Sequence, residues 1–309
     1  SKTPHAMTAL QFLDVDAVSS FTSLAFWTVF IAFFALYLAL RRSSQSVMLL
    51  YVVGFNLFFA LSAGLRTAVC LLIGIPLSFF LTKWIEKSKE GKRKAILVLT
   101  IAIEIAPLLY YKLAGEAGSL LHTLIHTNFS PTALVVPVGL AFFSVQAVSF
   151  SVDAYRNALK LRPTLLEYAF FLSFFPLLLA GPITRANTLL PQLRWRSTPR
   201  PPMVYGGLFL IGLGLAKKML VADYLATFVN VVFEQPTHYE GLELFFAALG
   251  FTAQIYADFS GYSDIAIGIA AVMGFRLKEN FNTPYAALNL TDFWRRWHIS
   301  LSYWIRDYV

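Results

Sequence analysis

Long unbroken apolar stretches, separated by short polar segments, dominate the hydrophobic pattern of this chain. The clearest is 21–40, twenty residues without a charge that end at Arg41 and Arg42. A helix needs about 20 apolar residues to cross the hydrocarbon core of a bilayer. The positive charges follow this stretch, whereas a cleavable signal peptide carries them before a shorter apolar core. The pattern therefore predicts membrane-spanning helices.

Further apolar stretches lie at 47–65, 67–82, 95–111, 132–152, 164–180, 203–216 and 242–275. The last is too long for one span, and Ser260 with Gly261 near its middle predicts a break into two helices. The polar segment 112–131 is predicted to be a loop. Its His122 and His126 have the spacing of a zinc pair, but no third ligand accompanies them, so we expect loop residues and no metal.

Basic residues between the stretches set the expected orientation. The segment 83–94 holds six lysines and arginines against two glutamates, and both it and Arg41–Arg42 should be cytoplasmic. The N-terminus is then outside, and 153–163 is a cytoplasmic turn. The next polar segment, 181–202, should be external, yet it carries four arginines. Either a neighbouring segment is re-entrant, or the rule is locally violated.

Composition agrees with a lipid environment. Of the 309 residues, 57% are hydrophobic and 14% charged, with a mean hydropathy of +0.63; a soluble domain carries about 25% charged residues. The net charge of +8 comes from residues between apolar stretches, so it fits lipid headgroups and excludes nucleic acid as a partner. Cys70 is the single cysteine and forms no intrachain disulfide.

Ionisable residues inside apolar stretches are candidates for function. Asp258 and Asp264 are two of them, but on one straight helix they would point about 120° apart and form no carboxylate pair. Hydrogen bonding to broken helix ends is the structural alternative. For Glu104 we favour a structural residue that faces the bundle. A second polar region, 289–308, has the pattern of an aromatic-rich amphipathic helix, with His298 near the boundary of its two faces.

The segment 292–302 reads Asp-Phe-Trp-Arg-Arg-Trp-His-Ile-Ser-Leu-Ser, and Trp-Ile-Arg-Asp-Tyr follows at 304–308. This closely resembles the signature of the membrane-bound O-acyltransferases, in the bacterial branch that O-acetylates alginate. Blocks similar to those of the family precede it in the same order, at 136–143, 151–156, 180–183, 191–193, 254–265 and 279–285. The resemblance covers 136–308, and the first 130 residues are similar in hydropathy alone.

The resemblance implies an all-α polytopic integral membrane protein, a helical bundle whose re-entrant and amphipathic helices form a funnel. It implies one membrane domain over 1–309, with peripheral transmembrane helices in 1–135 and the family core in 136–309. The implied reaction moves an acyl group, usually acetyl, from a cytoplasmic donor such as acetyl-CoA or an acyl carrier thioester, with no bound cofactor. The acceptor is a hydroxyl of an extracytoplasmic polysaccharide or a periplasmic acetyltransferase or relay protein, and the location is the bacterial cytoplasmic (inner) membrane.

The family uses two histidines, and His298 occupies the position of the first, which we assign as catalytic. The second, which is usually regarded as the catalytic one in the family, lies some tens of residues further on, so we expect a chain truncated before it. Lys217 and Lys218 are candidates for attracting the phosphates of the donor, and no metal site is expected. The residues expected to line or support the substrate tunnel are Asp258, Tyr262, Asp264, Asn280, Asn282, Trp294, Arg295, Arg296 and Trp297.

Three other functions stay open. A D-alanyl transferase of the teichoic acid type would share the architecture and differ in the acyl group. A transporter or flippase would show repeated halves, which the sequence lacks. A non-catalytic scaffold would recruit a periplasmic acetyltransferase. The acceptor is also open among alginate, cellulose, another exopolysaccharide and a wall polymer.

Overall fold

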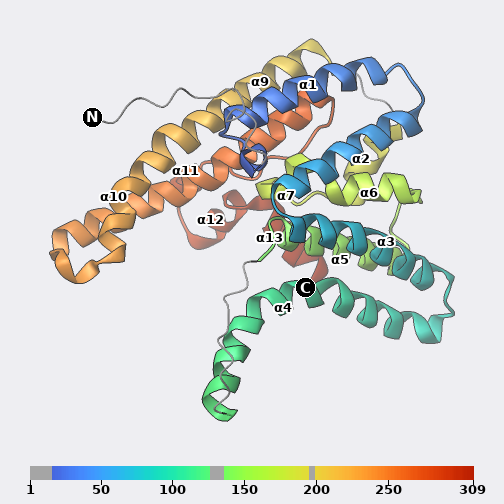
Figure 1. Cartoon of the computed structure of the whole chain (residues 1–309), viewed down its shortest axis with the longest axis horizontal. Helices are drawn as coiled ribbons and strands as arrows, with labels where there is room; N and C mark the ends of the chain where they lie inside the picture. The colour runs from blue at the N-terminus through green and yellow to red at the C-terminus, as the bar shows by residue number, and fades with distance from the viewer. Residues whose placement is uncertain (1–15, 126–135, 195–198) are drawn as a thin grey trace, which may run out of the picture.

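The computed structural model describes residues 16–125, 136–194 and 199–309. Every regular element in these ranges is helical (Figure 1). A π-helical segment, η3 (Ala216–Ala222), joins α9 to α10, and the short 3-10 turns are η2 (Asp16–Ser19), η4 (Pro236–His238) and η5 (Pro284–Ala286). The α-helices are α1 (Leu24–Leu40), α2 (Gln45–Ser62), α3 (Leu65–Lys87), α4 (Glu90–Ile125), α5 (Leu140–Tyr155), α6 (Leu165–Ser173), α7 (Phe175–Ala180), α8 (Ala186–Arg194), α9 (Pro201–Leu215), α10 (Asp223–Glu234), α11 (Gly241–Met273), α12 (Leu290–Arg296) and α13 (Ile299–Tyr308).

Four helical stretches are long and apolar enough to cross a membrane: Gln45–Ser62, Leu65–Lys87, Glu90–Leu113 and Pro201–Glu234. Large apolar side chains such as Phe80, Phe209 and Leu220 are 62–73% exposed on them. Only lipid covers so much apolar surface at low cost, so the predicted multi-pass membrane protein is confirmed.

The predicted loop at 112–131 is wrong over its first part. Helix α4 continues to Ile125, well beyond its apolar stretch. His122 lies in this helix, and His126 lies outside the described residues. The segment Ala114–Ile125 contains no proline, and its two glycines, Gly115 and Gly118, stand among good helix formers, so a helix once begun has no strong local reason to stop there.

An aromatic core surrounds the short helix α7. The Phe175 ring is fully buried, with its centroid 5.1 Å from that of Phe55 and 5.3 Å from that of Phe59. Phe30 of α1 approaches the same ring at 6.1 Å. Offset and edge-to-face aromatic pairs add about 0.5–1.5 kcal/mol each beyond the burial of their area. This cluster holds α1 and α2 against the segment that leads to the site.

Helices α6 and α7 form the re-entrant segment that the charge pattern allowed. They contain nine and six residues, too few to cross a bilayer. The side chain of Asn187, at the start of α8, donates to Ala158 O and accepts from Lys160 N, both at 2.9 Å. The chain therefore returns to the side from which α6 began, and Arg185, the first arginine after α7, lies on the basic side without violating the positive-inside rule.

The predicted break at Ser260 and Gly261 is wrong, because α11 is one helix of 33 residues. Gly261 serves packing instead: an added Cβ would lie 2.8 Å from Gly214 O on α9. Gly207 and Gly268 make a similar approach one step along, since a Cβ on Gly207 would lie 2.8 Å from Gly268 O. Small residues let two membrane helices come this close. The departure from regular α-helix lies instead in the segment that faces α11, where the π-helical η3 lies beside Gly261.

Glu104 faces the interior of the bundle, as the sequence predicted. It is 4% exposed, and its Oε1 accepts hydrogen bonds from Ser78 Oγ at 2.5 Å and Ser151 Oγ at 2.8 Å. Ser78 belongs to α3 and Ser151 to α5, so one carboxyl group joins three helices. Polar side chains that pair between membrane helices stabilise their association.

Candidate active site

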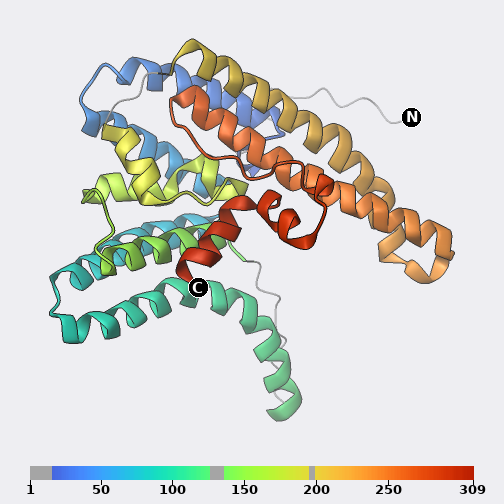
Figure 2. The same ribbon diagram turned by 180° about the vertical axis from the view of Figure 1, so that it is seen from behind.

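Helices α12 and α13 lie between α11 and the α3–α5 group (Figure 2). The single amphipathic helix predicted over 289–308 is wrong, because the chain turns sharply at His298. There φ is +40° and ψ is +54°, the left-handed region. For a residue other than glycine this costs about 1–2 kcal/mol. Such strain persists only where surrounding contacts impose it, and it gathers at functional sites.

The buried amide of Asn280 imposes this turn. Its Oδ1 accepts hydrogen bonds from Ser300 Oγ at 2.8 Å, from Ser300 N at 3.2 Å and from His298 Nδ1 at 3.1 Å. Ile299 N also donates to the Asn280 backbone oxygen at 2.9 Å. Asn280 is 1% exposed. Asn280, in the segment that follows α11, thus fixes the start of α13 and the orientation of the imidazole.

These bonds define the protonation of His298. An amide oxygen only accepts, so Nδ1 carries the proton and Nε2 keeps its lone pair. The Phe259 ring meets the imidazole edge-on with centroids 4.7 Å apart. Burial lowers the pKa of His298, which lies outside the spanning helices, to about 4. The imidazole is therefore neutral at pH 7 and is able to accept a proton at Nε2.

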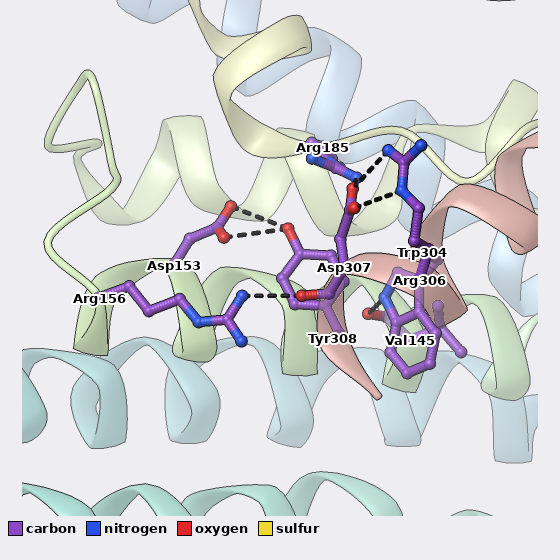
Figure 3. A network of polar contacts seen from close by, with 8 residues as sticks. All are labelled: Val145, Asp153, Arg156, Arg185, Trp304, Arg306, Asp307 and Tyr308. Carbon is purple, nitrogen blue, oxygen red and sulfur yellow. Dashed lines mark hydrogen bonds and ion pairs between the residues drawn. The ribbon is translucent and has the colours of Figure 1, made fainter.

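Helix α13 is anchored along its length by a polar network (Figure 3). Tyr308 donates its hydroxyl to both carboxylate oxygens of Asp153, at 3.0 Å each. Arg156 donates to Asp307 O at 2.8 Å, and Trp304 Nε1 donates to Val145 O at 3.1 Å. The helix that begins at His298 is thereby fixed to α5.

The carboxylate of Asp307 faces two guanidinium groups (Figure 3). It pairs with Arg185, from the segment after α7, and with Arg306 Nε at 2.9 Å. From the same segment, Ile183 N donates to Ser300 Oγ at 2.9 Å. We assigned no role to Arg185, Asp307 or Ser300 from the sequence. For Ser300 and Asp307 the one signal was their place in the family-like blocks, and Arg185 lies just outside the block at 180–183. Residues more than a hundred positions apart show no pairing in a single sequence.

Most of the predicted site residues fall into two groups. Around His298, Asn282 N donates to Arg296 O at 2.9 Å, and Trp297 packs on Phe281 with ring centroids 5.1 Å apart. Arg296 pairs with Asp292 at 2.9 Å. Trp294 is 56% exposed, and no ion pair is found for Arg295 among the described residues.

The second group lies where α11 meets η3. Lys217 pairs with Asp264 at 2.6 Å, and Lys218 pairs with Asp258 at 2.7 Å and with Asp223 at 2.6 Å. The Lys218 ammonium also lies 5.5 Å from the centre of the Tyr262 ring. Asp258 and Asp264 thus have separate partners and form no carboxylate pair. Because carboxylates already occupy both ammonium groups, the phosphate role of Lys217 and Lys218 stays a prediction that these contacts do not favour.

A family model described as "MBOAT, membrane-bound O-acyltransferase family" matches residues 80–309. The chain belongs to the membrane-bound O-acyltransferase family. The match begins earlier than the sequence blocks predicted, since it includes the end of α3 and all of α4. Within the described part of this chain, no cluster of three or more histidine, cysteine or acidic side chains is placed to hold a metal.

Several curated relatives are similar to this member of the family. A probable alginate O-acetylase AlgI of Pseudomonas aeruginosa is 37% identical over 217 residues, which are 69% of this chain and 41% of that protein. A peptidoglycan O-acetyltransferase of Helicobacter pylori is 29% identical over 287 residues, 84% of this chain and 54% of that protein. A teichoic acid D-alanyltransferase of Bacillus subtilis is 31% identical over 181 residues, which are 58% of this chain and 46% of that protein. The predicted resemblance to the alginate branch is confirmed, and the chain spans about half the length of the curated relatives it matches.

Proposed function

We propose that this chain belongs to an O-acetyltransferase that passes an acetyl group from a thioester donor to a hydroxyl of an extracytoplasmic polysaccharide or a relay protein. The observation that carries the proposal is the neutral His298, whose Nδ1 is tied to Asn280 and whose Nε2 keeps its lone pair. The names of the alginate and peptidoglycan relatives support acetyl as the acyl group and a polysaccharide as the acceptor.

In the proposed step, Nε2 of His298 takes the proton of the acceptor hydroxyl as its oxygen attacks the thioester carbonyl. The new C–O bond forms, the C–S bond breaks, and the proton passes from the imidazole to the departing sulfur. General base catalysis of this kind contributes about 10²–10⁴ in rate. Neither a metal nor a bound cofactor is needed for the balance of the step, and the donor is acetyl-CoA or an acyl carrier thioester.

The proposed location is the bacterial cytoplasmic membrane, with the segment 83–94 inside. D-alanyl transfer to a teichoic acid is the second candidate, and the Bacillus subtilis relative supports it. That relative matches a smaller share of this chain than the alginate and peptidoglycan relatives do. Membership of an acyltransferase family speaks against the transporter hypothesis.

The test is transfer of labelled acyl groups by the full-length protein in membranes. Labelled acetyl should reach the polysaccharide, and His298→Ala should lower its rate by about 100-fold or more, while labelled D-alanine should not be transferred. Undiminished acetylation by the variant would rule out the proposed role of His298. Transfer of D-alanine with no transfer of acetyl would select the second candidate.

A further inference from the structure

A polar cavity of about 350 Å³ lies between the segment after α7, the segment after α11 and helix α13. Three cationic side chains line it, Arg185, Lys278 and Arg306, together with the carboxylates of Glu279 and Asp307. Its size is within the range of ligand pockets, about 300–1,000 Å³. Ser300 also lines the cavity, and its hydroxyl donates to the same Asn280 oxygen as His298 does. The cavity therefore adjoins the candidate active site.

The cations of the cavity are not fully neutralised. Arg185 and Arg306 share the single carboxylate of Asp307, and two guanidinium groups carry ten N–H donors in all. Lys278 makes no ion pair among the described residues. The Arg306 guanidinium lies 4.6 Å from the centre of the Tyr303 ring, which holds it at the wall. Fixed guanidinium groups with unused donors are suited to binding phosphate.

Two contacts place the cavity on the basic side of the membrane. Arg93, in the basic segment 83–94, donates to Tyr155 O at 2.8 Å. The same end of α5 carries Asp153, to which the end of α13 is bonded. By the positive-inside rule this end of the bundle is cytoplasmic. A donor made in the cytoplasm would meet this cavity before it meets His298.

We propose that this cavity binds phosphate groups of the acyl donor, with Arg185, Arg306 and Lys278 as the recognising side chains. The inference rests on the proposed function for the identity of the donor as a thioester. Phosphate lies at the far end of a pantetheine arm in two sources, a free nucleotide thioester and a carrier protein. Binding at the cavity would direct the thioester end of either one toward Ser300 and His298.

The test measures dissociation constants of the full-length protein in nanodiscs for coenzyme A and for pantetheine, which lacks phosphate. Lys278→Gln and Arg306→Gln should each raise the Kd for coenzyme A about tenfold, the equivalent of one lost charged hydrogen bond. The Kd for pantetheine should stay unchanged. Arg276→Gln is the matched control, because it removes one positive charge two residues from Lys278 on a side chain that does not line the cavity. Thermal unfolding in the same nanodiscs establishes that each variant is folded.

A second arm replaces coenzyme A by a carrier protein with and without its phosphopantetheine arm. Binding that requires the arm and weakens in the lining variants supports the carrier as the source, whereas the same behaviour with coenzyme A supports the nucleotide thioester. Equal binding by wild type and lining variants in both arms, or an equal loss in Arg276→Gln, would overturn the proposal, as would no binding of either probe. Because no acceptor is present, charge-dependent binding would stand even if acetyl transfer were not found.

Discussion

The amide oxygen of Asn280 lies 3.1 Å from Nδ1 of His298 and holds the imidazole in a left-handed turn between two helices. The two residues are 18 positions apart in the sequence, one before α12 and one after it. This bond fixes the tautomer of His298 as well as its position, because an amide oxygen accepts only. The chemistry proposed for Nε2 depends on it.

Asn280→Asp should change the pH dependence of the reaction. In the wild type, burial lowers the pKa of His298 to about 4, so the base form is present at all higher pH values and is lost as the pH falls through that value. A carboxylate in place of the amide stabilises the imidazolium and raises this pKa. The acidic limb of the pH–rate profile should therefore move to higher pH. Asn289→Asp is the control: Asn289 is the N-cap of α12, a position that asparagine and aspartate suit equally. A shift of the same size in the control would contradict the assignment.

Two substitutions at the left-handed turn of His298 should differ in stability although both abolish activity. His298→Gly removes the base and relieves the strain, whereas His298→Val removes the base and adds a β-branched side chain at a positive φ. We expect the glycine variant to be more stable than the valine variant by about 1–2 kcal/mol, with acyl transfer abolished in both. Denaturant or thermal unfolding in detergent measures the difference. Equal stabilities would mean that the backbone at His298 is not constrained as described.

The close contact of α9 with α11 should make Gly261 intolerant of a side chain. A Cβ there would lie 2.8 Å from a backbone oxygen of the facing helix, and overpacking of this kind costs about 1–3 kcal/mol. Gly212→Ala is the matched control on α9, since nothing lies within 4 Å of its added Cβ. The control should gain up to about 1 kcal/mol from helix propensity. The thermal midpoints of Gly261→Ala and Gly212→Ala should thus move in opposite directions, and a tolerated Gly261→Ala would refute the close packing.

Tyr308→Phe should loosen α13. It removes both hydrogen bonds to the Asp153 carboxylate, which is 8% exposed, and we expect a loss of about 1–3 kcal/mol. Because α13 begins at His298, the rate of acyl transfer should fall as well. Tyr205→Phe serves as the control on a residue that is 71% exposed. An unfolding midpoint and a transfer rate equal to those of the control would show that this anchor is dispensable.

Hydropathy predicted the membrane-spanning helices because a segment that crosses lipid must be apolar along its length, and this requirement is visible in each segment by itself. The features it missed depend on contacts between segments. Gly261 was interpreted as a break, yet its missing side chain lets α9 approach. The turn at His298 carries no local signal such as a glycine, since it is imposed by Asn280. The pairing of Arg185 with Asp307 spans 122 positions, and no periodicity reaches that far.

The re-entrant α6–α7 segment determines the parity of crossings for everything after it. If 164–180 were counted as a crossing, α9 would begin outside and α11 would end outside, carrying Lys278 away from the cytoplasm. Because the chain turns back at α7, α9 begins and α11 ends on the side of the basic segment 83–94. Gln192 of α8 supports this sidedness, since it bonds Arg276 N at 2.8 Å just beyond α11. Two short helices that never cross the bilayer thereby decide on which side of the membrane the cavity beside His298 opens.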